Sequence, residues 1–209
     1  MEQGETRGIS WNDLPSYAQH RYYSIAMGKV YEDIAEPLRE FILRQHVFFV
    51  ATAPSGAGGH INLSPKGLDS FRVLGPKRAA YIDYPASGVE TIAHVRQNGR
   101  IVIMFCAFDG PPKIVRLHGQ GKVVEPQDAE FGELVTLFLP KMRPRAIICI
   151  DIERIADSCG YGVPLYEYRG ERAQLVAWSE KKGEAGLGRY QREKNALSID
   201  GLPGLRWVE

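Results

Sequence analysis

The residues best suited to chemistry lie at the end of a predicted strand, in the segment HINLSPKG at positions 60–67. Apolar and polar residues alternate up to Pro65, which is the pattern of a half-buried strand that then ends. At this strand end, Lys66 offers a positive charge, Ser64 a hydroxyl group, and Gly67 room for a close backbone approach. Two interpretations follow: a solvent-exposed turn, or an anion-binding site.

A second polar segment opens a predicted helix in SGVETIAHVRQNG, residues 87–99. The N-terminus of a helix has unpaired N–H groups and a partial positive charge, so a phosphate could dock beside Ser87, Gly88 and Thr91. The same residues also fit a capping box, in which Ser87 and Glu90 satisfy those N–H groups internally. The local sequence leaves both interpretations open.

Histidine and cysteine are spaced unlike the ligands of a metal site or the partners of a disulfide framework. No CxxC motif is present, and Cys106 and Cys149 lie in apolar runs that predict buried, inert thiols. The sequence also has no P-loop, GxGxxG, HExxH, EF-hand or nucleophile-elbow pattern. A metal site is therefore not predicted, and the main candidate is an anion site with an apolar wall.

Composition places the chain among globular proteins, with 44% hydrophobic and 24% charged residues among 209. Lys and Arg total 26 against 25 for Asp and Glu, a formal net charge of +1. This balance gives no electrostatic footprint for nucleic acid or an anionic membrane, so a few local cations should meet any bound anion. The N-terminal residues have no apolar core of a signal peptide, and no run approaches a membrane span, which predicts a cytoplasmic protein.

The elements that position these residues are mostly short strands with hairpin-length connections. The predicted strands cover residues 47–53, 60–64, 71–74, 79–84, 100–108, 113–124 and 146–152. Such a series favours an antiparallel barrel or sandwich. Gly119 and Gly121 lie within one strand and predict a bulge or a barrel corner there.

Helical periodicity covers residues 30–45, ahead of the first predicted strand, with a kink or restart at Pro37. Two further helices, at residues 87–99 and 126–140, interrupt the strands. The predicted organisation is an N-terminal extension at 1–29, a β-barrel domain at 30–156, and a C-terminal arm at 157–209 that packs on the barrel or on a dimer partner.

The order of these segments resembles the pyridoxamine 5′-phosphate oxidase-like family of FMN-binding split barrels. The resemblance covers residues 36–124, with a closing strand at 146–155, and rests on HVFFVATA, the SPKG strand end, a helix ending in NGRI, and RLHGQGKVV. It implies a mainly β fold: a split barrel of six to seven antiparallel strands with flanking helices. The oxidases have an Arg near Asn62 and a basic pair near Glu90 and Thr91, where this chain has Asn, Glu and Thr. Their substrate is therefore not predicted here.

The resemblance implies an FMN-dependent oxidoreductase that transfers hydride between the flavin and an unidentified small molecule. FMN would lie at the interface of a homodimer, with its phosphate held by basic and hydroxyl side chains. The residues carried over by position are Asn62, Leu63, Ser64, Lys66, Asp83, Tyr84, Ser87, Gly88 and Thr91. Cys106 and Arg116 are further candidate cofactor contacts, and Tyr161 in SCGYGVP is a candidate for the substrate pocket. For these last three residues, a structural role is the alternative. No side chain is identified as a required acid or base.

Three alternatives remain at this stage. A related split barrel could use a deazaflavin, although its longer anionic tail favours a more basic groove than this near-neutral chain suggests. A flavin- or haem-binding protein could hold its ligand without turnover, with His94 or His118 as the axial ligand of a haem. The barrel could also be an empty dimerisation module.

Overall fold

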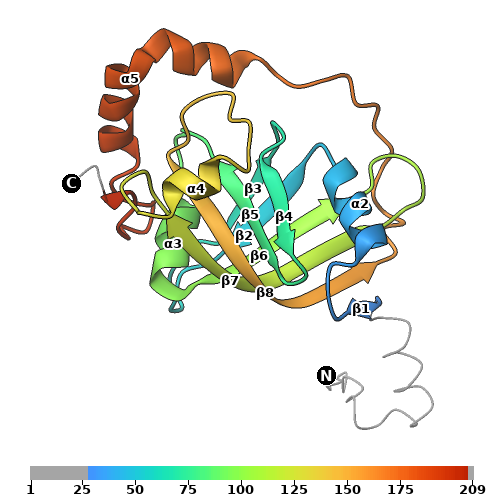
Figure 1. Ribbon diagram of the computed structural model, residues 1–209. Helices are drawn as coiled ribbons and strands as arrows, with labels where there is room; N and C mark the ends of the chain where they lie inside the picture. The colour runs from blue at the N-terminus through green and yellow to red at the C-terminus, as the bar shows by residue number, and fades with distance from the viewer. Residues whose placement is uncertain (1–27, 207–209) are drawn as a thin grey trace, which may run out of the picture.

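The computed structural model describes residues 28–206 and shows a mainly β fold built on one antiparallel sheet (Figure 1). Its eight strands are β1 Val30–Tyr31, β2 Phe48–Thr52, β3 Asn62–Lys66, β4 Phe71–Gly75, β5 Arg78–Asp83, β6 Arg100–Cys106, β7 Ile114–Val124 and β8 Ala146–Ser158. The flanking helices are α2 Glu36–Arg44, α3 Glu90–Asn98, α4 Phe131–Val135 and α5 Gln174–Lys194. The predicted fold class is confirmed, and β1 is added to the seven predicted strands.

The strand order is β3-β2-β6-β7-β8-β5-β4, with β1 paired to β8. β3 and β4 follow each other in the chain but lie at opposite ends of this order, so the sheet is open between them. The register of β7 on β8 shifts between His118 and Gly119, which confirms the predicted bulge. A Cβ atom at Gly119 would lie 2.1 Å from the Asp151 carbonyl oxygen, so only glycine fits this crossing.

The core lies on the inner face of the sheet, where alternate residues of paired strands meet. One row runs across four strands from Val50 to Ile103, Leu117 and Ile155, all of them buried. An aromatic cluster centred on Phe48 adds edge contacts with Phe71 and Tyr81, at ring-centroid distances of 5.2 and 5.5 Å. Burying each such side chain contributes roughly 1.5–3 kcal/mol, which makes this sheet a rigid support for its edges.

The helix prediction for residues 30–45 is wrong at its start. Val30 and Tyr31 pair with Ala156 and Ile155 of β8, and the helix begins only at Glu36. Pro37 lies in the first turn, where its missing N–H removes no helical hydrogen bond. The helix predicted at 87–99 ends as expected, because Gly99 takes a left-handed conformation with φ of 73°.

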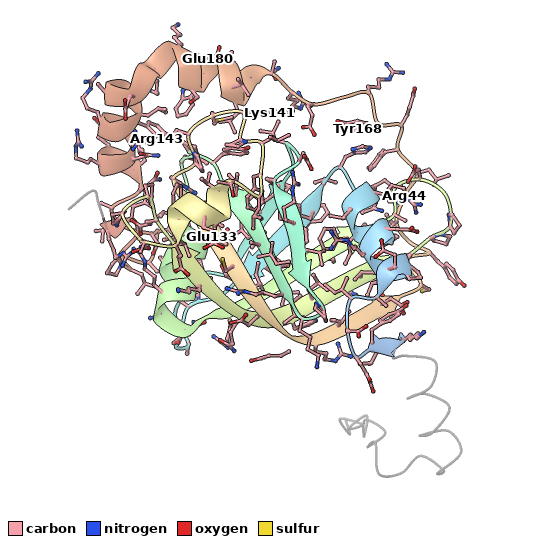
Figure 2. All side chains as sticks on the ribbon, viewed as in Figure 1. Arg44, Glu133, Lys141, Arg143, Tyr168 and Glu180 are labelled. Carbon is pink, nitrogen blue, oxygen red and sulfur yellow. The ribbon has the colours of Figure 1, made fainter. Side chains whose placement is uncertain are left out.

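After β8 the chain runs past α2 and then over the top of the view in Figure 1 to α5. On the way it passes α2, where the Tyr168 ring stacks on His46 with centroids 3.5 Å apart (Figure 2). α5 contains a non-helical residue, Gly183, which divides it into two parts. Most of the predicted N-terminal extension, residues 1–27, lies outside the described residues. Within 28–206, no helix is long and apolar enough to cross a membrane.

Candidate functional site

A cavity of about 330 Å³ lies between β3, the loop after β5, the start of α3 and the start of β8. It is lined by Asn62, Ser64, Pro65, Lys66, Ala86, Ser87, Gly88, Glu90, Thr91 and Arg145. The structure thus brings together two polar segments that the sequence separates, the SPKG strand end and the start of the helix. The alternation of β3 explains the first segment, because Asn62, Ser64 and Lys66 share its partly buried face.

A buried ion cluster borders this cavity. Asp83, at the end of β5, is fully buried, and its Oδ1 lies 2.8 Å from Lys66 Nζ. Its Oδ2 lies 2.7 Å from Nε of Arg145, whose side chain is only 3% exposed. Burial raises the pKa of the Asp83 carboxyl, but Arg145 and Lys66 together outweigh burial and hold that pKa at about 2. The three groups therefore carry a net charge of +1 at neutral pH.

Both oxygens of Asp83 are engaged by these cations, so the structure gives Asp83 the role of positioning Lys66 and Arg145. Arg145 was not predicted from the sequence, where it is one basic residue in the segment RPRAIICI. Its position follows from the pairing of β5 with β8, in which Asp83 lies opposite Ala146. The Arg145 backbone N–H also donates to the Asp83 carbonyl oxygen, over 3.0 Å.

A hydrogen-bond network fixes the uncharged wall of the cavity. The Asn62 side-chain amide donates to Thr91 Oγ1 over 2.9 Å and to Thr52 Oγ1 over 3.3 Å. Ser64 Oγ donates to Asn62 Oδ1 over 2.9 Å, and Thr52 Oγ1 lies 3.0 Å from His94 Nδ1. His94 is fully buried, and this burial lowers its pKa, so its ring is neutral at neutral pH. Asn62 therefore ties β3 to α3 across the cavity.

The capping-box interpretation of Ser87 and Glu90 is wrong. The N-cap residue of α3 is Val89, and no side chain among the described residues caps this helix. Glu90 Oε1 instead accepts a hydrogen bond from the backbone N–H of Ile199, over 3.4 Å. The first turn of α3 therefore offers N–H groups and partial positive charge to the cavity, whereas the Glu90 carboxylate opposes an anion there.

These donors fit the phosphate end of FMN. Two cations share one carboxylate, and the hydroxyl groups of Ser87 and Thr91 stand beside the N-terminus of α3. The lining includes no aromatic side chain among the described residues, so the cavity has no stacking surface for an isoalloxazine ring. The ring of a bound flavin would therefore have to lie outside this cavity.

Other residues predicted for the cofactor site lie elsewhere. Leu63 is on the outward face of β3 and is 64% exposed. Tyr84 is buried in a second apolar cluster near α4, and its hydroxyl accepts a hydrogen bond from the Lys141 backbone N–H over 3.4 Å. Cys106 is buried at the end of β6, where burial raises the pKa of its thiol. The structure does not bring these residues to the cavity.

Arg116 and Tyr161 also lie outside the cavity. Arg116 is on the outward face of β7, and its Nη1 donates to Ser158 Oγ over 3.0 Å. Tyr161 follows β8 and is 82% exposed, and it is not among the residues that line the cavity between β3 and α3.

The outward face of the sheet is largely apolar. Its partly exposed residues include Phe49, Ala51, Val102, Met104, Arg116 and His118, with the exposed Ile61 and Leu63 beside them. A second cavity, of about 440 Å³, lies on this face, and His118 is among its lining residues. Of the two histidines considered as haem ligands, His118 therefore borders open space, whereas His94 is fully buried.

Residues 34–159 match a family model described as pyridoxamine 5′-phosphate oxidase. A curated relative from Aspergillus flavus, the pyridoxamine 5′-phosphate oxidase family protein ustO, is 41% identical over 194 residues, covering 84% of this chain and 77% of the relative.

Two solved structures align with parts of this chain. HupZ from Group A Streptococcus aligns with a TM-score of 0.47 and 23% identity, over 58% of this chain and 91% of that one. General Stress Protein 26 from Bacillus anthracis aligns with a TM-score of 0.43 and 12% identity, over 56% of this chain and 88% of that one.

Proposed function

The chain belongs to the pyridoxamine 5′-phosphate oxidase family, a family of flavin-binding oxidoreductase type, and we propose that it binds FMN with the phosphate in the cavity between β3 and α3. The observation that carries this proposal is the cluster of Lys66, Arg145 and Asp83. One buried carboxylate holds two cations, which leaves a net positive charge beside a cavity lined with hydroxyl groups.

The phosphate would meet this cluster through Lys66 and Arg145, and would accept hydrogen bonds from Ser87, Thr91 and the first turn of α3. A phosphomonoester carries between one and two negative charges at neutral pH, so the net charge of the cluster favours it. Because Lys66 also pairs with Asp83, removing Lys66 changes the net charge of the whole cluster. Without Lys66, Arg145 and Asp83 form a neutral pair, and the phosphate loses the excess positive charge.

Bound FMN would supply hydride transfer with an unidentified small molecule. The protein residues would bind and orient the flavin and exclude water. Within the cavity region, Asp83 is ionised and paired, and His94 is neutral and enclosed, so neither is placed to exchange protons with a substrate. We therefore assign the side chains of this cavity to binding and not to acid–base catalysis.

The proposed active form is a two-fold homodimer with the flavin at its interface. The phosphate cavity lacks a surface for the ring, while the neighbouring outward face of the sheet exposes Ile61 and Leu63, at 79% and 64%. A second copy packed on this face would bury these residues and complete the site, and two-fold dimers are the commonest soluble assembly. Analytical ultracentrifugation should show a dimer, and Leu63→Asp should shift it towards monomer.

The test of FMN binding is an absorbance titration followed by gel filtration. The wild-type protein should retain flavin bands, and Lys66→Ala should weaken FMN binding by about tenfold to a hundredfold, the effect of one charge-assisted hydrogen bond. The matched control is Lys122→Ala on β7, because Lys122 pairs with Glu130 at the surface, away from the cavity. A colourless protein that does not retain FMN would contradict the proposal.

A Soret band sensitive to His118→Ala would favour the haem alternative, and retention of a deazaflavin alone would favour the deazaflavin reductase.

A further inference from the structure

The last described segment of the chain, residues 195–206, returns from α5 to the candidate phosphate cavity. Figure 1 shows this red segment beside α3. It is firmly packed at both ends, since Asn195 is fully buried and Leu205 is only 2% exposed. The segment lies beyond residues 34–159, the part of the chain that matches the family model.

Asn195 contacts the loop that lines the cavity. Its side-chain amide donates to the Ala86 carbonyl oxygen over 3.0 Å and to the Ser87 carbonyl oxygen over 3.3 Å. Arg145 Nη1 donates to the same Ala86 oxygen over 3.0 Å. The loop is thus held from one side by a cation of the cluster and from the other side by Asn195.

The backbone of the segment fixes Asn195 in turn. The Asn195 N–H donates to the Gln191 carbonyl oxygen over 2.7 Å, and the Leu205 N–H donates to the Asn195 carbonyl oxygen over 2.9 Å. A Cβ atom at Gly204 would lie 2.2 Å from that same carbonyl oxygen, so the close approach of the two ends of the segment requires glycine. Asn195 therefore reaches the cavity loop from a rigid base.

The turn of the segment contacts two further parts of the cavity region. Asp200 Oδ2 accepts from the His60 N–H over 2.9 Å, and its Oδ1 lies 2.6 Å from His60 Nδ1, so the chain leading into β3 is anchored. The Ile199 N–H donates to Glu90 Oε1 over 3.4 Å, so the segment also contacts the first residue of α3. The segment thus contacts both sides of the cavity, the β3 side and the α3 side.

We propose that segment 195–206 determines specificity for phosphate-bearing flavin, with Asn195 as the positioning residue for the Ala86–Ser87 loop. This inference rests on the proposed binding of FMN. The loop places Ser87 and the α3 N-terminus at the cavity, where the phosphate would bind, whereas the flavin ring would lie outside it. Loosening the loop therefore removes phosphate contacts and leaves the ring contacts intact.

The experiment compares the dissociation constants of FMN and riboflavin, which differ only in the phosphate. In Asn195→Leu, which keeps the branching at Cγ and removes the amide donor, the preference for FMN over riboflavin should fall about tenfold, the effect of roughly one lost hydrogen bond. The matched control is Ser198→Ala in the same segment, because the Ser198 hydroxyl accepts a hydrogen bond from the Leu202 N–H of its own turn, over 3.1 Å. Its FMN preference should equal that of the wild-type protein. Equal losses of FMN and riboflavin affinity in Asn195→Leu would show a purely structural role and overturn the proposal.

Hydrogen exchange and a second variant distinguish a failure of this inference from a failure of the proposed FMN binding. Hydrogen exchange of the flavin-free protein should be faster at the amides of residues 86–89 in Asn195→Leu than in Ser198→Ala. Unchanged exchange there would overturn the positioning role, even if the wild-type protein binds FMN. If exchange is faster in Asn195→Leu but the wild-type protein binds no flavin, the positioning role is supported and the proposal of FMN binding is contradicted. If Asn195→Leu does not fold, Asp200→Ala removes the second anchor and should lower the FMN preference by a smaller factor.

Discussion

Two buried carboxylates in this protein, Asp83 and Glu125, hold basic side chains in similar ways but differ in charge balance. Asp83 pairs with Lys66 and Arg145, and no second carboxylate bonds to these cations among the described residues. Glu125 pairs with Arg96 and Arg206, and Asp128 takes up Arg206 as well. The first cluster carries a net charge of +1, whereas the second is neutral.

The two clusters also differ in their access to a ligand. The Asp83 cluster borders the cavity between β3 and α3, into which an anion could enter. The Glu125 cluster is closed by the chain itself, because the backbone N–H of Arg206 donates to both Glu125 oxygens, over 3.3 and 3.1 Å. A buried ion pair alone therefore says little about function, while an uncompensated charge beside a cavity indicates a ligand.

The largest expected effect comes from neutralising each carboxylate. Asp83→Asn and Glu125→Gln should each lower the free energy of unfolding by about 3–5 kcal/mol, because each removes the buried carboxylate that pairs with a largely buried arginine, Arg145 or Arg96. Inorganic phosphate should restore part of the loss in Asp83→Asn, since the cavity admits an anion, but not in Glu125→Gln. Urea denaturation with and without phosphate measures both. Equal stabilisation of both variants by phosphate would contradict the claim that only the Asp83 cluster is open to an anion.

The next effect concerns FMN affinity. Arg145→Gln removes a charge from the open cluster and should weaken FMN binding about tenfold or more. Arg206→Gln removes a charge from the closed cluster and should leave FMN binding unchanged. Isothermal titration of both variants provides the measurement. Similar losses in the two variants would mean that the effect is global destabilisation.

Acid stability should also distinguish Asp83. Its pKa of about 2 in the folded protein lies below its ordinary value near 3.8. The ionised carboxylate therefore stabilises the fold fully at pH values above about 3.8. This stabilisation, about 2 kcal/mol, should be lost as the pH falls from about 4 to about 2. Asp83→Asn should lack this part of the pH dependence in urea denaturation at about pH 6 and about pH 3. A parallel pH dependence in the variant would contradict the assignment.

The smallest expected effect has the opposite sign. Glu90 lines the cavity and opposes an anion, so Glu90→Gln should strengthen FMN binding by a few-fold, in the range of a partly exposed charge interaction. Riboflavin binding should not change, because riboflavin has no phosphate. A fluorescence titration of both flavins tests this, and weaker FMN binding in the variant would show that Glu90 has another role.

The sequence predicts the strands well because each one combines alternation of apolar residues with clear turn signals. It misses β1, since two residues show no periodicity. Ser64, Lys66, Ser87 and Thr91 are found from the resemblance and from local chemistry, and they do line one cavity.

The rest of the candidate site depends on long-range contacts. The position of Arg145 is set by the register of β5 on β8, which local patterns do not reveal. The contact of Asn195 with Ala86 joins residues 109 positions apart. The segment SIDGLPG predicts a turn, but nothing in its local sequence indicates which part of the fold that turn contacts. For the same reason, the sequence assigns Asp83 to the cofactor, whereas the structure shows it paired with two cations.

The most direct test of the account is a parallel titration of wild-type protein with FMN and with riboflavin. The net charge of the Lys66, Arg145 and Asp83 cluster predicts that FMN binds at least about tenfold more tightly, and that this advantage shrinks as salt concentration rises. Equal affinities for the two flavins, or an advantage of FMN that Lys66→Ala leaves intact, would contradict the assignment of the phosphate to this cavity.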